Sequence, residues 1–112
     1  FEKLGKNPEF QRVYHEGISK ADKYLVMYAD KGHEGASRYG FSVSKRIGNS
    51  VMRHRVTRLF REAVFKLDDH VEKGSHIIII ARPPVIKLHY EEICKSFIKL
   101  FKAHHIWKGD ED

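Results

Sequence analysis

Hydrophobic and polar positions along this chain follow two different periods, which predict a mixture of helices and strands. Residues 7–17 carry apolar side chains at helical spacing, and the Asn7-Pro8 pair is typical of a helix start, with the asparagine as the cap. Side chains over residues 23–29 alternate between two faces, with Tyr24, Val26 and Tyr28 on one and Leu25 and Met27 on the other. Over residues 38–44, apolar residues alternate with small or polar ones. This alternation predicts two strands, separated by a turn that contains glycine.

The second half of the chain predicts a helix, a strand and a final helix. We expect helices over residues 51–67, capped by Asn49 or Ser50, and over residues 90–102. The continuous apolar run at residues 77–81 is typical of a strand buried on both faces. The strands before and after the first of these helices would run parallel, which makes a β-α-β unit.

Together these elements predict one α+β domain over residues 1–112, because no linker, repeat or low-complexity segment divides the chain. The expected order is α-β-β-α-β-α. A further short strand near Ser19 would extend it to α-β-β-(β)-α-β-α. The final helix is expected to bury Ile93, Cys94, Phe97, Ile98 and Phe101, with Cys94 as a small hydrophobic residue.

The helix at residues 51–67 has two chemically different faces. One is an apolar stripe that we expect to face the core, made of Met52, Val56, Leu59, Phe60, Ala63 and Leu67. The opposite side carries His54, Arg58, Arg61 and Phe65, flanked by Arg55. This helix is therefore expected to pack on the sheet and to turn a basic surface outward.

The net charge of +6, with a pI of about 9.5, comes from one part of the chain. Residues 38–61 hold seven of the 21 Lys and Arg residues and none of the 15 Asp and Glu residues. A solvated face normally mixes both signs, because like charges at helical spacing repel. The clustering therefore favours a polyanion as the partner.

The cations around the start of the basic helix oppose its macrodipole. Lys45 and Arg46 precede the helix, and Arg53 and Arg55 lie in its opening turns, where each positive charge costs about 0.3–1 kcal/mol. Together with backbone N–H groups that we expect to be free at residues 48–50, this arrangement suits a bound phosphate. Arginine also favours bidentate phosphate contacts. The alternative is that these arginines pair with acidic residues elsewhere in the chain.

Aromatic residues are concentrated ahead of the basic stretch, at Phe10, Tyr14, Tyr24 and Tyr28. Rings beside a basic surface can hold unpaired nucleotides by stacking, at about 1–3 kcal/mol per base. Rings at such spacing also fill hydrophobic cores, and the spacing alone favours the core. The residues themselves leave both interpretations open.

The composition disfavours several classes of protein. The longest apolar run has five residues, far below the roughly 20 of a membrane span, and no signal-peptide pattern opens the chain. The single cysteine excludes an internal disulfide and fits a reducing compartment. The eight histidines are scattered, without metal-ligand spacing or a recurring carboxylate partner. We therefore expect a cytoplasmic protein with no membrane partner and no metal site.

Three acidic or aromatic features have simple structural explanations. The adjacent acids at residues 68–69 and 91–92 suit a helix-end cap and a complement to the dipole of a first turn. Trp107 and the acidic residues Asp110, Glu111 and Asp112 are expected to form a frayed C-terminus.

A specific motif lies within the basic stretch. The segment at residues 44–62, SKRIGNSVMRHRVTRLFRE, closely resembles the signature of the bacterial ribonuclease P protein family. Further matching segments are residues 7–17, 23–28, 77–82 and 90–92, so the resemblance covers about residues 4–105. It implies an α/β sandwich with a mixed sheet, like the second domain of ribosomal protein S5, with a left-handed β-α-β crossover.

The resemblance also implies a function. A member of this family binds a large catalytic RNA and assists endonucleolytic removal of the 5′ leader from precursor tRNA. The catalytic groups and the Mg²⁺ ions would belong mainly to the RNA, so no catalytic residue, protein metal site or organic cofactor is expected. The expected partners are ribonuclease P RNA and precursor tRNA, with no DNA.

Individual roles follow by position in the motif. The residues implied to dock on the RNA subunit are Lys45, Arg46, Asn49, Arg53, His54, Arg55, Arg58 and Arg61. Phe10, Tyr14 and Tyr28 match the family's leader-binding cleft, which favours the binding interpretation of these rings. Two positions depart from the family: His54 replaces the central Asn of the motif, and Thr57 stands where many members have Lys. Neither change removes the basic face.

Two other functions remain as alternatives. One is a ribosomal or RNA-assembly protein that binds structured RNA without cleavage. The other is a metal-dependent nuclease that acts without RNA. Cleavage that requires a ribonuclease P RNA would separate the family's function from both.

Overall fold

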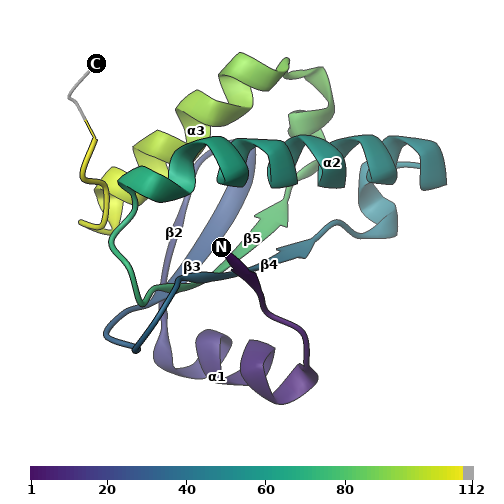
Figure 1. Cartoon of the computed structure of the whole chain (residues 1–112). Helices are drawn as coiled ribbons and strands as arrows, with labels where there is room; N and C mark the ends of the chain where they lie inside the picture. The colour runs from purple at the N-terminus through teal and green to yellow at the C-terminus, as the bar shows by residue number, and fades with distance from the viewer. Residues whose placement is uncertain (110–112) are drawn as a thin grey trace.

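The computed structural model describes residues 1–109 as a five-stranded sheet with helices on both faces. Figure 1 shows α1 on one face of the sheet and α2 and α3 together on the other. In chain order the elements are β1 (Glu2–Lys3), α1 (Asn7–Glu16), β2 (Ile18–Ala21), β3 (Leu25–Asp30), β4 (Arg38–Ser42), α2 (Ser50–Leu67), β5 (His76–Ala81) and α3 (Tyr90–Ala103). Short 3₁₀ turns occupy Lys45–Ile47, Asp68–His70 and Pro83–Lys87. The arrangement confirms the predicted α/β sandwich.

The sheet is mixed, with strand order β1-β4-β5-β3-β2. The strands β4 and β5 run parallel and are joined through α2, which confirms the β-α-β unit. The strand β3 pairs antiparallel with β5 on its other side, and β2 is the expected short strand near Ser19. The strand β1 was not predicted, because two residues show no period and pair only with the distant β4. The handedness of the crossover stays a prediction.

The main core lies between the sheet and the pair α2 and α3. Leu25, Met27 and Ala29 of β3 and Ile77 and Ile79 of β5 point into it. The helix α2 buries the predicted stripe from Val56 to Leu67, adds Val64, and leaves Met52 half-buried. In α3 the buried residues are Ile93, Cys94, Ser96, Phe97, Leu100 and Phe101, whereas Ile98 is only half-buried. The core positions α2 so that its opposite side faces outward.

A smaller cluster lies on the other face of the sheet, beneath α1. Leu4, Val13 and Ile78 are buried there, and Phe10, Tyr14, Tyr28 and Ile80 pack around them. The Phe10 ring lies against Gly40 of β4, where an added Cβ would overlap the ring. The small side of β4 therefore lets an aromatic ring of α1 approach the sheet closely.

Replacing Gly40 by alanine is expected to lower the free energy of unfolding by about 1–3 kcal/mol, because the new methyl group displaces the Phe10 ring. Urea unfolding of Gly40→Ala and the unsubstituted protein measures this difference. Gly5→Ala is the matched control, because a Cβ at Gly5 meets no atom within 4 Å. Equal loss of stability in both variants would contradict the close approach of Phe10.

Two predictions are wrong, one about the start of α1 and one about the C-terminal segment of the chain. The N-cap of α1 is Lys6, and Asn7 is the first helical residue, because Glu9 accepts hydrogen bonds from the N–H groups of Gly5 (3.0 Å) and Lys6 (3.3 Å). Trp107 is not frayed: it forms an antiparallel bridge with Val71, and its ring stacks parallel to that of Phe101. Asp110, Glu111 and Asp112 lie outside the described residues.

The predicted roles of the paired acids are confirmed. Asp68 is the C-cap of α2 and accepts a hydrogen bond of 2.9 Å from the Tyr39 hydroxyl. Glu92 in the first turn of α3 accepts from the N–H of His89. No helix within residues 1–109 is long and apolar enough to cross a bilayer.

Candidate nucleic-acid interface

The outward side of α2 carries the predicted basic surface. His54, Arg55, Arg58 and Arg61 are all exposed there, and we call these four residues the basic face. Within residues 1–109, none of its arginines forms an ion pair with a carboxylate. The structure therefore disfavours the alternative in which these arginines serve to pair with acids of the same chain.

A shallow groove runs along this part of α2. It encloses about 800 Å³ and is lined by Val43, Val51, Arg53, His54, Arg55, Thr57, Arg58 and Arg61. Arg53 differs from the other arginines of the groove because it is half-buried. Its Nη2 donates to the Ser50 hydroxyl at 3.3 Å, and its Nε is buried without a hydrogen-bond partner among the described residues. Arg53 thus forms the floor of the groove more than its exposed wall.

The turn before α2 holds the remaining predicted contacts. Lys45 and Arg46 lie exposed in the 3₁₀ turn, and the Asn49 side chain caps the helix by accepting from the N–H of Met52 at 3.0 Å. The expectation of a free N–H at Gly48 is wrong, because this group donates to the Lys45 carbonyl at 3.2 Å. One of the three N–H groups that were expected to be free is therefore already engaged within the chain.

The structure brings Phe10, Tyr14 and Tyr28 together, and we call them the aromatic cluster. The rings of Tyr14 and Tyr28 meet edge to face with their centroids 5.0 Å apart. All three residues are half-buried, so each ring both packs on the sheet and keeps an accessible part. Burial, and to a smaller extent Tyr28, raises the pKa of Tyr14. Tyr24 is separate, because it packs against the main core on the other face.

The aromatic cluster packs beneath α1, whereas the basic face belongs to α2, and these two helices lie on opposite faces of the sheet (Figure 1). A separate hollow of about 510 Å³ lies where β4 and β5 end. Its lining includes Ile80, which packs on the aromatic cluster, and Arg46, which lies in the turn leading to α2. The lining of this hollow thus holds one residue predicted to dock on RNA and one neighbour of the aromatic cluster.

Arg82 is a candidate binding residue that the sequence interpretation missed. It lines the same hollow as Arg46, and its Nη1 donates to the Asp22 carbonyl at 2.9 Å. In the sequence, Arg82 directly follows the buried strand and precedes Pro83 and Pro84, which end the strand. This position is the signal from which Arg82 could have been identified.

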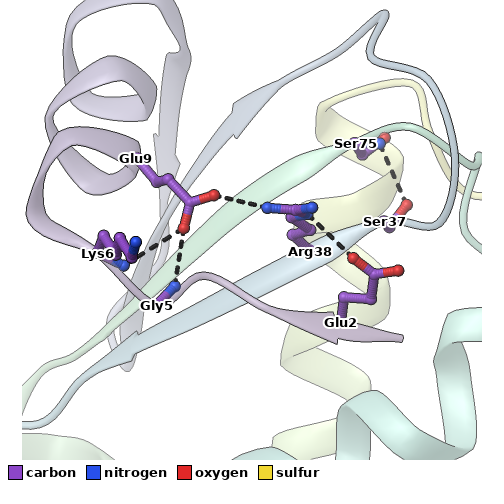
Figure 2. A network of polar contacts seen from close by, with 7 residues as sticks. All are labelled: Glu2, Gly5, Lys6, Glu9, Ser37, Arg38 and Ser75. Atoms are coloured by element: carbon purple, nitrogen blue, oxygen red, sulfur yellow. Dashed lines mark hydrogen bonds and ion pairs between the residues drawn. The ribbon is translucent and has the colours of Figure 1, made fainter.

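Arg38 has a structural role, unlike the other cations of the basic stretch. Figure 2 shows its guanidinium between Glu9 of α1, at 2.6 Å, and Glu2 of β1, at 3.1 Å. Backbone N–H groups of Gly5 and Lys6, and more weakly Arg38, hold the pKa of Glu9 below its usual value. These contacts tie β1 and α1 to β4, which positions the aromatic cluster above the sheet.

Comparison with known proteins decides the family. The ribonuclease P family model matches residues 1–105. The chain belongs to the ribonuclease P protein family. The ribonuclease P protein component of Bacillus cereus strain G9842 is 44% identical over 101 residues, which are 89% of this chain and 88% of that protein. The family assignment confirms the resemblance found in residues 44–62.

Solved structures of the family share the fold. The Staphylococcus aureus RNase P protein superposes with a TM-score of 0.85 at 31% identity, over 96% of this chain and 98% of that chain. The Thermotoga maritima RNase P protein gives 0.82 at 23% identity, over 92% and 97%, which shows the fold alone. Membership of the family assigns the chain to ribonuclease P, a ribonucleoprotein nuclease of tRNA processing.

Metal-ligating side chains do not gather in the part of the chain that the structure describes. No group of three or more His, Cys, Asp or Glu residues there could hold a metal ion.

Proposed function

We propose that this chain is the protein subunit of ribonuclease P and binds the catalytic RNA through the basic face of α2. The observation that carries this proposal is a row of exposed arginines without ion pairs to carboxylates in residues 1–109. The apolar stripe of α2 fixes the helix on the sheet, so the guanidinium groups project from a rigid support. Planar guanidinium groups bind phosphate with two parallel hydrogen bonds.

The RNA-binding surface extends beyond the basic face. Lys45 and Arg46 continue it at the start of α2, and Asn49 holds that end of the helix in place. Arg53 supports the floor of the groove. In this proposal the RNA-binding surface follows one helix and the turn before it.

The aromatic cluster is proposed to receive the single-stranded 5′ leader of precursor tRNA. Unpaired bases stack on aromatic rings irrespective of sequence, which suits leaders that differ between tRNAs. The hollow at Arg46 and Arg82 would then bind the phosphate backbone of the leader as it passes toward the RNA subunit. This arrangement lets one protein contact the catalytic RNA and the substrate at once.

Hydrolysis itself is assigned to the RNA subunit. In this proposal Mg²⁺ is held mainly by the RNA, the protein carries no catalytic residue or organic cofactor, and the complex acts in the cytoplasm. The protein contributes positioning and charge. Its effect should therefore be greatest at low Mg²⁺, where fewer cations screen the phosphates of RNA and substrate.

Equilibrium binding tests the choice of RNA. The protein is expected to bind a bacterial ribonuclease P RNA roughly a thousandfold more tightly than a ribosomal RNA fragment of equal length, at the same salt concentration. Filter binding of both labelled RNAs measures the ratio. Equal affinity for both would favour a general RNA-assembly protein instead.

A further inference from the structure

The outward side of α2 continues for another helical turn beyond Arg61, its last arginine. Phe65 lies four residues after Arg61 and is 79% exposed, the highest exposure among the large hydrophobic residues of the described chain. At helical spacing it continues the line of Arg58 and Arg61. An exposed ring at this position extends the basic face without adding charge.

Phe65 borders a hollow that a second ring helps to form. The hollow encloses about 430 Å³ and is lined by Glu62, Phe65 and Lys66 of α2 and by Tyr90 of α3. The Tyr90 hydroxyl donates to the Glu62 carbonyl at 3.2 Å, and the Lys66 ammonium lies 5.8 Å from the centre of the Tyr90 ring. Contacts with α2 therefore hold the Tyr90 ring in place before any ligand arrives.

The chemistry around this hollow matches a nucleobase. A flat aromatic ligand can stack on the Phe65 ring, and the Glu62 carboxylate can accept a hydrogen bond from an exocyclic amino group. The ammonium of Lys66 can contact the phosphate of the same nucleotide. The single proton of the Tyr90 hydroxyl is already donated to the Glu62 carbonyl, so Tyr90 offers the ligand its ring and not a hydrogen bond from its hydroxyl.

We propose that the hollow between Phe65 and Tyr90 holds an unpaired base of the RNA that docks on the basic face of α2. This inference rests on the proposed function, because the neighbouring arginines orient the RNA. An RNA strand that follows the arginines of α2 reaches Phe65 one helical turn after Arg61. A base in the hollow would fix the register of the RNA along the helix, which phosphate contacts alone do not specify.

Binding of a bacterial ribonuclease P RNA to Phe65 variants tests this inference. Phe65→Ala is expected to weaken binding about tenfold at fixed salt, within the range for loss of one stacked base. The slope of log affinity against log salt should stay unchanged, because no charge is removed. Phe65→Tyr should restore affinity, since it keeps the ring. Lys66→Ala should instead reduce the salt slope.

A fluorescence readout tests stacking directly. The emission of Phe65→Trp should be quenched by the RNA beyond the change seen for Trp107 in the unsubstituted protein. Unchanged affinity of Phe65→Ala, with Arg58→Ala still weakened, would overturn the base site and leave the proposed function intact. Failure of the unsubstituted protein to bind the RNA would instead overturn the proposed function. Sedimentation provides a further check: dissociation of a protein dimer by Phe65→Ala, without an effect on RNA binding, would also overturn the base site.

Discussion

Replacing Arg55, Arg58 and Arg61 together by alanine is expected to weaken binding to ribonuclease P RNA by about a thousandfold. Hydrogen bonds to charged groups contribute about 1.5–3 kcal/mol each, which corresponds to a factor of ten or more per arginine. The slope of log affinity against log salt should fall by about 2–3, since each lost phosphate contact contributes roughly 0.7–0.9. Filter binding over a range of salt concentrations measures both quantities.

A triple variant of equal charge separates docking from general attraction. Lys23, Lys73 and Lys87 are exposed and lie outside the basic face, so their replacement by alanine removes the same net charge. This control is expected to weaken binding much less than the arginine variant. Equal effects of the two triple variants would mean that net charge, and not the basic face, determines RNA binding.

Replacing Tyr28 by alanine is expected to reduce the affinity of the assembled ribonucleoprotein for leader-bearing tRNA by about 5- to 150-fold. Loss of one stacked base accounts for about 1–3 kcal/mol. Mature tRNA lacks the leader, so its affinity should remain nearly unchanged. Competition binding with precursor and mature forms of one tRNA gives the comparison.

Two further variants show whether a loss of affinity comes from the missing ring or from misfolding of the protein. Tyr28→Leu keeps apolar volume beside Tyr14 but removes the ring face, and it should behave like Tyr28→Ala if stacking matters. Tyr28→Phe keeps the ring and should behave like the unsubstituted protein. Equal loss of affinity for precursor and mature tRNA would remove the aromatic cluster from leader binding.

The elements that the sequence predicted well are those whose signals are local. The helix α2 repeats its apolar positions over five turns and begins at an asparagine cap, so both its extent and its two faces could be inferred. The strand β5 is a continuous apolar run that ends before two prolines. Each of these signals is complete within one segment of the chain.

The elements that were missed depend on partners far away in the sequence. The strand β1 forms because it pairs with β4. Trp107 is held in place by its bridge to Val71 and by its stack on Phe101. The predicted cap at Asn7 was wrong because the helix is capped at Lys6, where the Glu9 carboxylate accepts from the N–H groups of Gly5 and Lys6. Tertiary contacts of this kind leave little trace in local periodicity.

In the candidate interface, too, the features with local sequence signals could be predicted and those that depend on distant residues could not. The basic face could be predicted, because a helix places residues three and four apart on one side. The closeness of Phe10, Tyr14 and Tyr28 was implied by family resemblance, whereas their spacing alone favoured a core role. The hollow at Arg46 and Arg82 joins two segments that lie far apart in the sequence, and only the folded structure brings them together.

The most direct test of the central claim is processing of a precursor tRNA at low Mg²⁺ by three samples: protein alone, ribonuclease P RNA alone, and both together. The proposed function predicts cleavage at the leader junction only in the mixture, with rates lowered by the triple arginine variant. Cleavage by the protein alone would contradict the assignment of catalysis to the RNA. Absence of stimulation in the mixture would contradict the role of this chain as a ribonuclease P subunit.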